Sequence, residues 1–367
     1  MKIMHLLPSL SSGGVEQVVL EICQGMHEHG EECVVVSAGG PMVPAIEATG
    51  AKHITRPIGK KRLSTLLQVR EMMRLIRAER PDILHMHSRV PAWVGYLAHK
   101  FLRPEERPVL LTTFHGHYSV NAYSAIMTKG ERIIAVSRFI KQHILERYPS
   151  TPENRICVID NTIDPTRENP DYRPSSEWLA KWRAENPHLA GKYILCLPSR
   201  ITRWKGAEHL APILCSLKAR GVPAHALILG EAKKGKEAFK RELVQKYAQA
   251  GISSDVTWLG LRRDVQDIFC VSDVILSLSL QPESFGKISL EALALGKPVA
   301  GYAHGGISEQ LEQFLPAGMI PVGDTEAMAA RLAEWYRCPP TLRQPVGKPY
   351  RRQDMIESHL SLYRSLT

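Results

Sequence analysis

Short apolar runs of the strand type alternate with longer stretches of helical spacing along most of this chain. Residues 2–7, 33–37 and 83–87 are such runs, and residues 15–28 and 63–78 are helical stretches between them. Strands and helices in alternation are typical of parallel sheets that carry helices on both faces. The alternation therefore predicts an α/β fold and argues against an all-helical or all-β chain.

One segment interrupts the alternation. Residues 164–187 are rich in proline and charge, and the pattern resumes at Tyr193 and continues through residue 302. A chain of 367 residues is long for one hydrophobic core and comfortable for two. We therefore predict two Rossmann-like domains, the first over residues 1–175 and the second over residues 185–349.

Two carboxylates flank a predicted helix start in the second domain. Glu283 precedes the turn at residues 285–287, Glu291 lies about one turn inside the helix, and Gly296 ends that helix at the usual glycine position. The first N–H groups of a helix lack partners and face an anion favourably. Such a site can hold a sugar diphosphate, although for an arbitrary pair a capping glutamate and an exposed one are the better explanation, so the surrounding sequence must decide.

The sequence around this helix favours a ligand site over a capping and an exposed glutamate. Strand patterns at residues 274–279 and 298–302 make the helix the crossover of a β-α-β unit, with Glu283 at a strand's carboxyl end, where ligands bind in open parallel sheets. Arg200 follows another strand, and Lys205 opens the next helical segment. Two fixed positive charges at this edge would stabilise a departing nucleoside diphosphate, because its negative charge grows as the bond breaks.

These residues resemble a known family. Gly13-Gly14-Val15-Glu16, Arg200 with Lys205-Gly206, and the stretch 283–291 with Gly305-Gly306 occur in this order in retaining family 4 glycosyltransferases. The chain is similar to that family, of the lipopolysaccharide-core type, over almost its whole length. The resemblance implies a GT-B fold, in which two Rossmann-like domains face each other across a cleft. It also implies that the last helix, within residues 350–367, returns to the first domain.

The resemblance further implies transfer of a hexose from a nucleotide sugar to an acceptor hydroxyl. Arg200 and Lys205 would bind the phosphates, Glu291 the ribose, Glu283 the sugar hydroxyls, and His115 would stabilise charge near the reacting carbon. The predicted catalytic residues are Arg200, Lys205, Glu283 and His115, and the predicted donor-binding residues are Gly13, Gly14, Ser199, Phe285, Gly286, Lys287 and Glu291.

No metal or cofactor is expected. Asp-x-Asp, which commonly holds diphosphate through a divalent metal in sugar transferases, does not occur in the chain. The pairs His85/His87 and His115/His117 have a spacing that points both rings to one face of a strand, but neither local motif contains a carboxylate. The G-x-G-x-x-G and P-loop motifs are also missing, which argues against a dinucleotide enzyme or a P-loop NTPase.

Basic residues gather in one part of the first domain. Lys60, Lys61 and Arg62 precede a helical stretch that carries Arg70, Arg74 and Arg77, and the whole chain has a formal charge of +10. A solvated helix packed on its sheet is the simpler interpretation. The alternative is a patch for the acceptor or an anionic membrane, where each basic residue contributes about 1 kcal/mol. Nucleic acid is not expected, because no aromatic residues interleave these charges.

The sequence gives weaker indications of the cellular location and of the substrates. The sequence contains no apolar run of about 18 residues, so no membrane span is predicted. The seven scattered cysteines form no C-x-x-C pair and are expected to be free thiols. We expect a cytoplasmic protein, with the inner face of the cytoplasmic membrane as an alternative site. A UDP-sugar donor and a glycan or glycolipid acceptor of the cell envelope are preferred. The alternatives are a non-catalytic module that binds nucleotide sugars or anionic lipid, and an epimerase or phosphorylase of the same fold.

Overall fold

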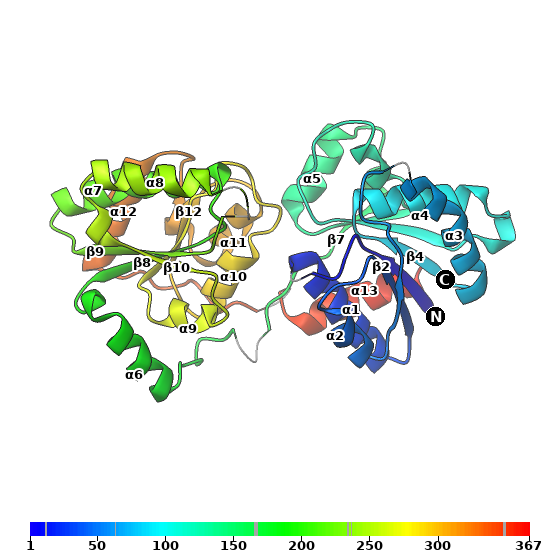
Figure 1. Ribbon diagram of the computed structural model, residues 1–367, viewed down its shortest axis with the longest axis horizontal. Helices are drawn as coiled ribbons and strands as arrows, with labels where there is room; N and C mark the ends of the chain where they lie inside the picture. The colour runs from blue at the N-terminus through cyan, green and yellow to red at the C-terminus, as the bar shows by residue number, and fades with distance from the viewer. Residues whose placement is uncertain (12, 63, 165–167, 233–234, 236, 348–349) are drawn as a thin grey trace. The chain divides into compact units, whose positions relative to one another are not determined.

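The computed structural model describes residues 1–11, 13–62, 64–164, 168–232, 235, 237–347 and 350–367. The chain forms two compact units, one from Met1–Thr162 with Lys348–Thr367 and the other from Ile163–Gly347 (Figure 1). Each unit holds one parallel sheet covered by helices, which confirms the predicted α/β class and the two Rossmann-like sheets. Within the described part of the chain, the longest helix has 16 residues, and none is long and apolar enough to span a bilayer.

The sheet of unit 1 has seven strands in the order β3-β2-β1-β4-β5-β6-β7. Its strands are β1 (Lys2–Leu6), β2 (Glu32–Ser37), β3 (Lys52–Thr55), β4 (Ile83–Met86), β5 (Val109–Phe114), β6 (Arg132–Ala135) and β7 (Ile156–Val158). Its helices are α1 (Gly14–Glu28), α2 (Val43–Ala48), α3 (Ser64–Glu79), α4 (Arg89–Phe101), α5 (Arg138–Arg147) and α13 (Arg352–Arg364). The strand order reverses between β1 and β4, which is the switch point where open sheets of this kind bind ligands.

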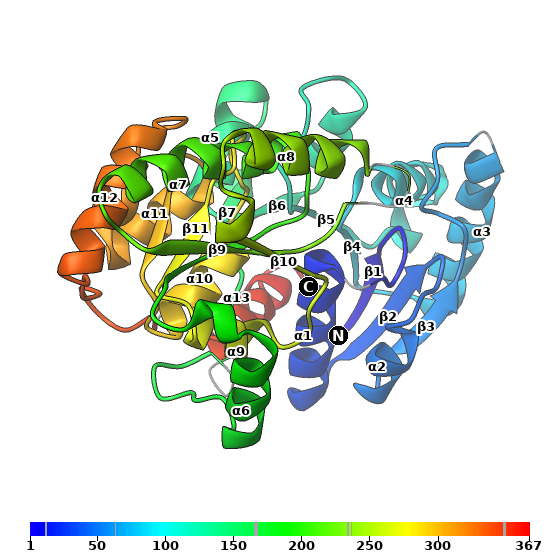
Figure 2. The ribbon, with the colours of Figure 1, turned by 60° about the vertical axis from the view of Figure 1, so that its left-hand side comes forward.

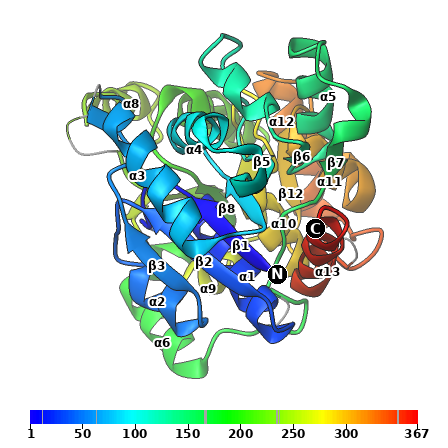
Figure 3. The same cartoon turned by 90° about the vertical axis from the view of Figure 1, so that its right-hand side faces the viewer.

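The last helix belongs to the core of unit 1. Apolar residues of α13, including Met355, Ile356 and Leu360, join a buried cluster with residues of α1 and the sheet. Gly25 allows the close approach of α1 and α13, because a Cβ there would lie 2.6 Å from atoms of the Ile356 side chain. On another part of this unit, α3 and α4 pack side by side (Figure 3).

The sheet of unit 2 has six strands in the order β10-β9-β8-β11-β12-β13. Its strands are β8 (Tyr193–Pro198), β9 (Ala224–Leu229), β10 (Val256–Gly260), β11 (Val274–Ser277), β12 (Val299–Tyr302) and β13 (Met319–Ile320). Its helices are α6 (Ser176–Glu185), α7 (Leu210–Ala219), α8 (Ala238–Gln249), α9 (Val265–Cys270), α10 (Lys287–Ala294), α11 (Gly306–Phe314) and α12 (Thr325–Arg337). Helices α7 and α8 lie over one face of this sheet and α9 lies under the other (Figures 1 and 2).

Candidate functional site

Two loops of unit 2 are joined at the carboxyl ends of β8 and β11. The Lys205 ammonium donates a hydrogen bond of 2.7 Å to Oε1 of Glu283, and the Ser279 hydroxyl donates to the same oxygen. The backbone N–H of Leu280 donates to the carbonyl of Trp204 over 2.7 Å. The structure therefore brings Lys205 and Glu283 together at the sheet edge where the sequence places them, and joins them as an ion pair.

Glycines allow these loops to approach each other closely. Gly206 has a φ of 71°, and a Cβ there would lie 1.9 Å from the carbonyl oxygen of Leu278. Gly305 has a φ of 67°, and a Cβ there would lie 2.5 Å from the carbonyl oxygen of Glu283, which also accepts a 2.8 Å hydrogen bond from the Gly306 N–H. Gly206 therefore lies against the backbone at the end of β11, and Gly305 lies against Glu283 itself.

Helix α10 begins directly after this loop. Its N-cap is Gly286, with a φ of 83°, and the carbonyl of Phe285 accepts a 2.7 Å hydrogen bond from the Gln310 side chain. Phe285 is buried, whereas Lys287 and Glu291 are partly exposed on the helix. The N-terminus of α10 therefore lies at the same loop as the Lys205–Glu283 pair, as an anion site requires.

Arg200 and Ser199 complete the predicted set in unit 2. Both follow β8 directly; Ser199 is partly buried and Arg200 is exposed. Among the described residues, Arg200 forms no ion pair with an acidic side chain, in contrast to Lys205. No acidic side chain in the described part of the chain therefore neutralises its charge.

The predicted residues of unit 1 lie at the ends of β1 and β5. Gly13 is the N-cap of α1 with extended backbone, and Gly14 begins the helix with no atom within 4 Å of the position of an added Cβ. His115 follows β5, and its Nε2 lies 3.0 Å from Nδ1 of His87. Burial of the His115 ring lowers its pKa to about 3, so the imidazole is neutral at physiological pH.

The basic residues do not form one continuous patch. Lys60, Lys61 and Arg62 border a pocket of about 210 Å³ together with Trp93 and Tyr123, and the Lys61 ammonium lies 3.6 Å from the centre of the Tyr123 ring. The other residues lie on α3: Arg70 is exposed, Arg74 pairs with Glu71, and Arg77 pairs with Glu106 at 3.0 Å.

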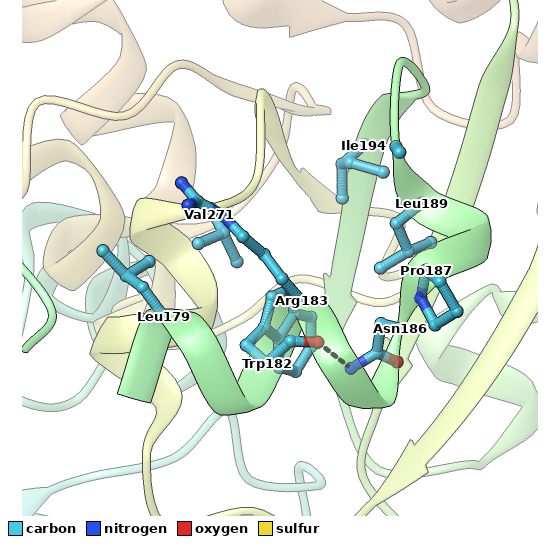
Figure 4. Close-up of a pocket in the computed structure, with 9 residues that line it drawn as sticks. Leu179, Trp182, Arg183, Asn186, Pro187, Leu189, Ile194 and Val271 are labelled. Carbon is cyan, nitrogen blue, oxygen red and sulfur yellow. Dashed lines mark hydrogen bonds between the residues drawn. The ribbon is translucent and has the colours of Figure 1, made fainter. Parts of the chain in front are cut away.

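A larger cavity in unit 2 lies away from the candidate site. It has a volume of about 540 Å³ and is lined by residues such as Trp182, Leu189, Ile194 and Val271 (Figure 4). Ile194 is near the start of β8 and Val271 precedes β11, so the cavity lies toward the amino ends of the strands. Ligands of open parallel sheets bind at the opposite, carboxyl edge.

Comparisons with known proteins agree with this fold. Residues 12–167 match the family description Glycosyltransferase Family 4, and residues 180–352 match Glycosyl transferases group 1. The chain therefore belongs to the glycosyltransferases of family 4 type with the GT-B fold, and it is a glycosyltransferase.

Individual relatives are distant. Alpha-maltose-1-phosphate synthase of Mycolicibacterium smegmatis is 27% identical over 70% of this chain and 69% of its own length. Among solved structures, a glycosyltransferase from Rickettsia africae has a TM-score of 0.82 at 26% identity, covering 100% of this chain and 98% of its own. HepE of Anabaena, solved in complex with UDP, has a TM-score of 0.79 at 20% identity and full coverage of both chains, a likeness that concerns the fold.

Proposed function

We propose that the protein is a retaining, metal-independent glycosyltransferase that moves a hexose from a UDP-sugar to a hydroxyl of a cell-envelope glycan, of the lipopolysaccharide core type. The observation that carries the proposal is the Lys205–Glu283 pair beside the start of α10. One cation, one carboxylate and the positive end of a helix then surround the place where a sugar diphosphate would bind. The solved complexes of Anabaena HepE with UDP and with UDP-glucose support a UDP-linked donor.

Glu283 can bind a sugar hydroxyl while it keeps its ion pair with Lys205. Its Oε1 accepts from Lys205 and Ser279, while Oε2 takes part in no hydrogen bond within the described residues. A carboxylate oxygen accepts hydroxyl protons, so Oε2 is suited to the sugar hydroxyls. Lys205 has three N–H donors and uses one for Glu283, which leaves donors for a phosphate oxygen.

Arg200 and Lys205 would stabilise the leaving diphosphate, and Glu291 would bind the ribose. In this scheme the acceptor hydroxyl attacks from the face that the leaving group vacates, and a phosphate oxygen takes the acceptor proton. The new glycosidic bond forms as the bond from the anomeric carbon to phosphate breaks. No protein nucleophile and no metal take part, and the charges of the two basic side chains balance the developing negative charge.

The acceptor is proposed to bind unit 1, at the pocket bordered by Lys60, Lys61 and Arg62. The three cations and the rings of Trp93 and Tyr123 suit an anionic group attached to an apolar body, such as a glycolipid or the inner face of the cytoplasmic membrane. Replacing all three basic residues with alanine should weaken binding to anionic vesicles roughly 100-fold, at about 1 kcal/mol for each charge. Arg74→Ala with Arg77→Ala is the matched control, since both arginines already pair with glutamates; equal loss in the control would contradict the assignment.

The experiment that tests the activity is turnover of a panel of nucleotide sugars with envelope glycan acceptors, with the anomeric configuration of the product assigned by NMR. A retained configuration supports the proposal, and an inverted one contradicts it. Calorimetric binding of UDP-sugar without product from any acceptor would instead favour a non-catalytic nucleotide-sugar module. Conversion of the donor without acceptor would favour an epimerase.

A further inference from the structure

His304 links two loops that meet at the candidate site of unit 2. It follows β12, and its Nε2 lies 2.7 Å from the carbonyl oxygen of Ser279, a buried residue that follows β11. The hydroxyl of Ser279 donates to Oε1 of Glu283, the oxygen that also accepts from Lys205. Ser279 therefore contacts His304 through its backbone and Glu283 through its side chain.

The two loops are packed against each other along their backbones. β11 and β12 pair in parallel, with Ser277 opposite Gly301, so both loops leave the sheet at its carboxyl edge. Gly305 comes directly after His304, and a Cβ there would lie 2.7 Å from the backbone nitrogen of Glu283. The loop that carries His304 is therefore fixed against the loop that carries Glu283.

The partner of Nε2 decides which nitrogen of the His304 ring donates. A backbone carbonyl oxygen carries no hydrogen, so it accepts and Nε2 donates. In a neutral imidazole that donates from one nitrogen, the other nitrogen is an acceptor. Nδ1 of His304 is that acceptor. It takes part in no hydrogen bond within the described residues, and the ring is only partly buried.

An acceptor nitrogen discriminates between the parts of a sugar nucleotide. Sugar hydroxyls can donate a hydrogen bond, whereas the oxygens of an ionised diphosphate only accept. Nδ1 of the neutral His304 ring can therefore bind a sugar hydroxyl and not the diphosphate. Glu283 is an acceptor as well, so the paired loops present two acceptors that can bind two hydroxyls.

We propose that His304 is a specificity-determining residue whose Nδ1 accepts a hydrogen bond from a hydroxyl of the donor sugar. The inference rests on the proposed function, because it takes a nucleotide sugar as the ligand at this edge of the sheet. The two ring nitrogens then have separate roles: Nε2 stabilises the loop at Ser279, and Nδ1 contacts the sugar.

Two conservative variants separate these roles. The amide nitrogen of a glutamine can take the position of Nε2, and the amide oxygen of an asparagine can take that of Nδ1. His304→Gln should therefore keep the hydrogen bond to Ser279 and the melting temperature, and lose the sugar contact. His304→Asn should lower the melting temperature and keep the sugar contact. A purely structural role predicts the opposite order for the two variants.

Calorimetry of the full-length protein measures the contact with the sugar. The probes are UDP alone and UDP-glucose, UDP-galactose and UDP-N-acetylglucosamine, of which the tightest binder is used further. We expect His304→Gln to leave the Kd for UDP unchanged and to raise that for the UDP-sugar about tenfold, which corresponds to one hydrogen bond of about 1.4 kcal/mol. An equal loss for UDP would place the ring at the diphosphate and overturn the inference, as would unchanged binding of the UDP-sugar.

His225→Gln is the matched control. The His225 ring is buried and bonds to Oγ1 of Thr257 over 2.8 Å, but it lies near the amino end of β9, at the opposite edge of the sheet. We expect a lower melting temperature with unchanged Kd values for UDP and for the UDP-sugar. A loss of sugar affinity equal to that of His304→Gln would refute the inference.

Deoxyfluoro analogues of the selected UDP-sugar identify the hydroxyl. Fluorine cannot donate, so the analogue that lacks the contacted hydroxyl should bind the unaltered protein about tenfold more weakly and should not distinguish it from His304→Gln. If every analogue still distinguishes the two proteins, the hydroxyl contact is wrong. If UDP-sugars bind as expected but no acceptor is glycosylated, the proposed function fails and the sugar contact stands. If no UDP-sugar binds more tightly than UDP, both are contradicted.

Discussion

Mild acid should unfold unit 1 well before unit 2. Burial lowers the pKa of seven histidines in unit 1, and four of these shifts are large: well below the ordinary value for His85 and His87, to about 3 for His115 and to about 4 for His359. In the unfolded chain each would have a pKa near 6.5. The unfolded state therefore binds protons that the folded state does not, so stability is complete above about pH 6.5 and decreases as the pH falls below it.

The size of the effect follows from proton linkage. Between pH 7 and pH 5 His115 and His359 each cost about 2 kcal/mol, and His85 and His87 add to the loss in the same direction. That loss is comparable with the whole stability of an ordinary domain, about 5–15 kcal/mol. In unit 2 the largest such contribution comes from His225, whose pKa burial lowers to about 4, and a smaller one from His209.

Hydrogen exchange followed by mass spectrometry would measure the loss of unfolding free energy for each unit separately. After correction for the intrinsic pH dependence of exchange, peptides from β1, β4 and β5 should lose several kcal/mol of protection between pH 7 and pH 5, and peptides from β8 and β9 much less. His359→Leu should reduce the loss in unit 1 by about 2 kcal/mol. A loss below about 2 kcal/mol in unit 1, or equal losses in both units, would show that the histidines are not held neutral.

Three further predictions concern unit 2 and the reaction. Arg200→Ala should lower kcat by about 10² to 10³ with an unchanged melting temperature, because the side chain is exposed and pairs with no described acid. The control is Arg203→Ala, which removes an exposed ion pair with Glu242 and a cation–π contact with Phe239; equal kinetics in the two variants would refute the role. Gly206→Ala should lower the melting temperature strongly, because its Cβ would overlap the Leu278 carbonyl, whereas Gly221→Ala, with a φ of 72° but open space, should cost only about 1 kcal/mol. Donor turnover should be unchanged after treatment with EDTA, and activity restored only by a divalent ion would contradict the metal-free scheme.

The architecture was largely predictable because buried parallel strands leave strong apolar runs in a sequence. Two strands leave little trace in the sequence. β3 (Lys52–Thr55) is an edge strand with polar residues and little burial, and β13 (Met319–Ile320) has two residues, so neither forms a clear apolar run. Helix α4 contains Pro91, which the helix tolerates because it falls in the first turn, where proline costs no hydrogen bond.

The site was predictable in position and less so in its contacts. The sequence places Lys205 and Glu283 at the ends of separate strands, and the strand order brings those ends to one edge. The ion pair itself depends on the path of two loops, and that path depends on Gly206 and Gly305 in conformations with positive φ. Local sequence indicates that these glycines bend the chain, but not which carbonyl each one approaches.

The buried histidines of unit 1 show more clearly what a sequence leaves undetermined. The spacing of His85 and His87 predicts two rings on one face, and the structure confirms it with ring centres 4.0 Å apart. His5, however, belongs to no sequence motif. It lies beside these rings because β1 pairs with β4 in register, with His5 opposite His85. Strand order and register are long-range properties, so a hydrogen-bonded chain that crosses β1, β4 and β5 becomes visible only when the sheet is assembled. Contacts between side chains on different strands are for this reason harder to infer from sequence than the side chains of a local motif.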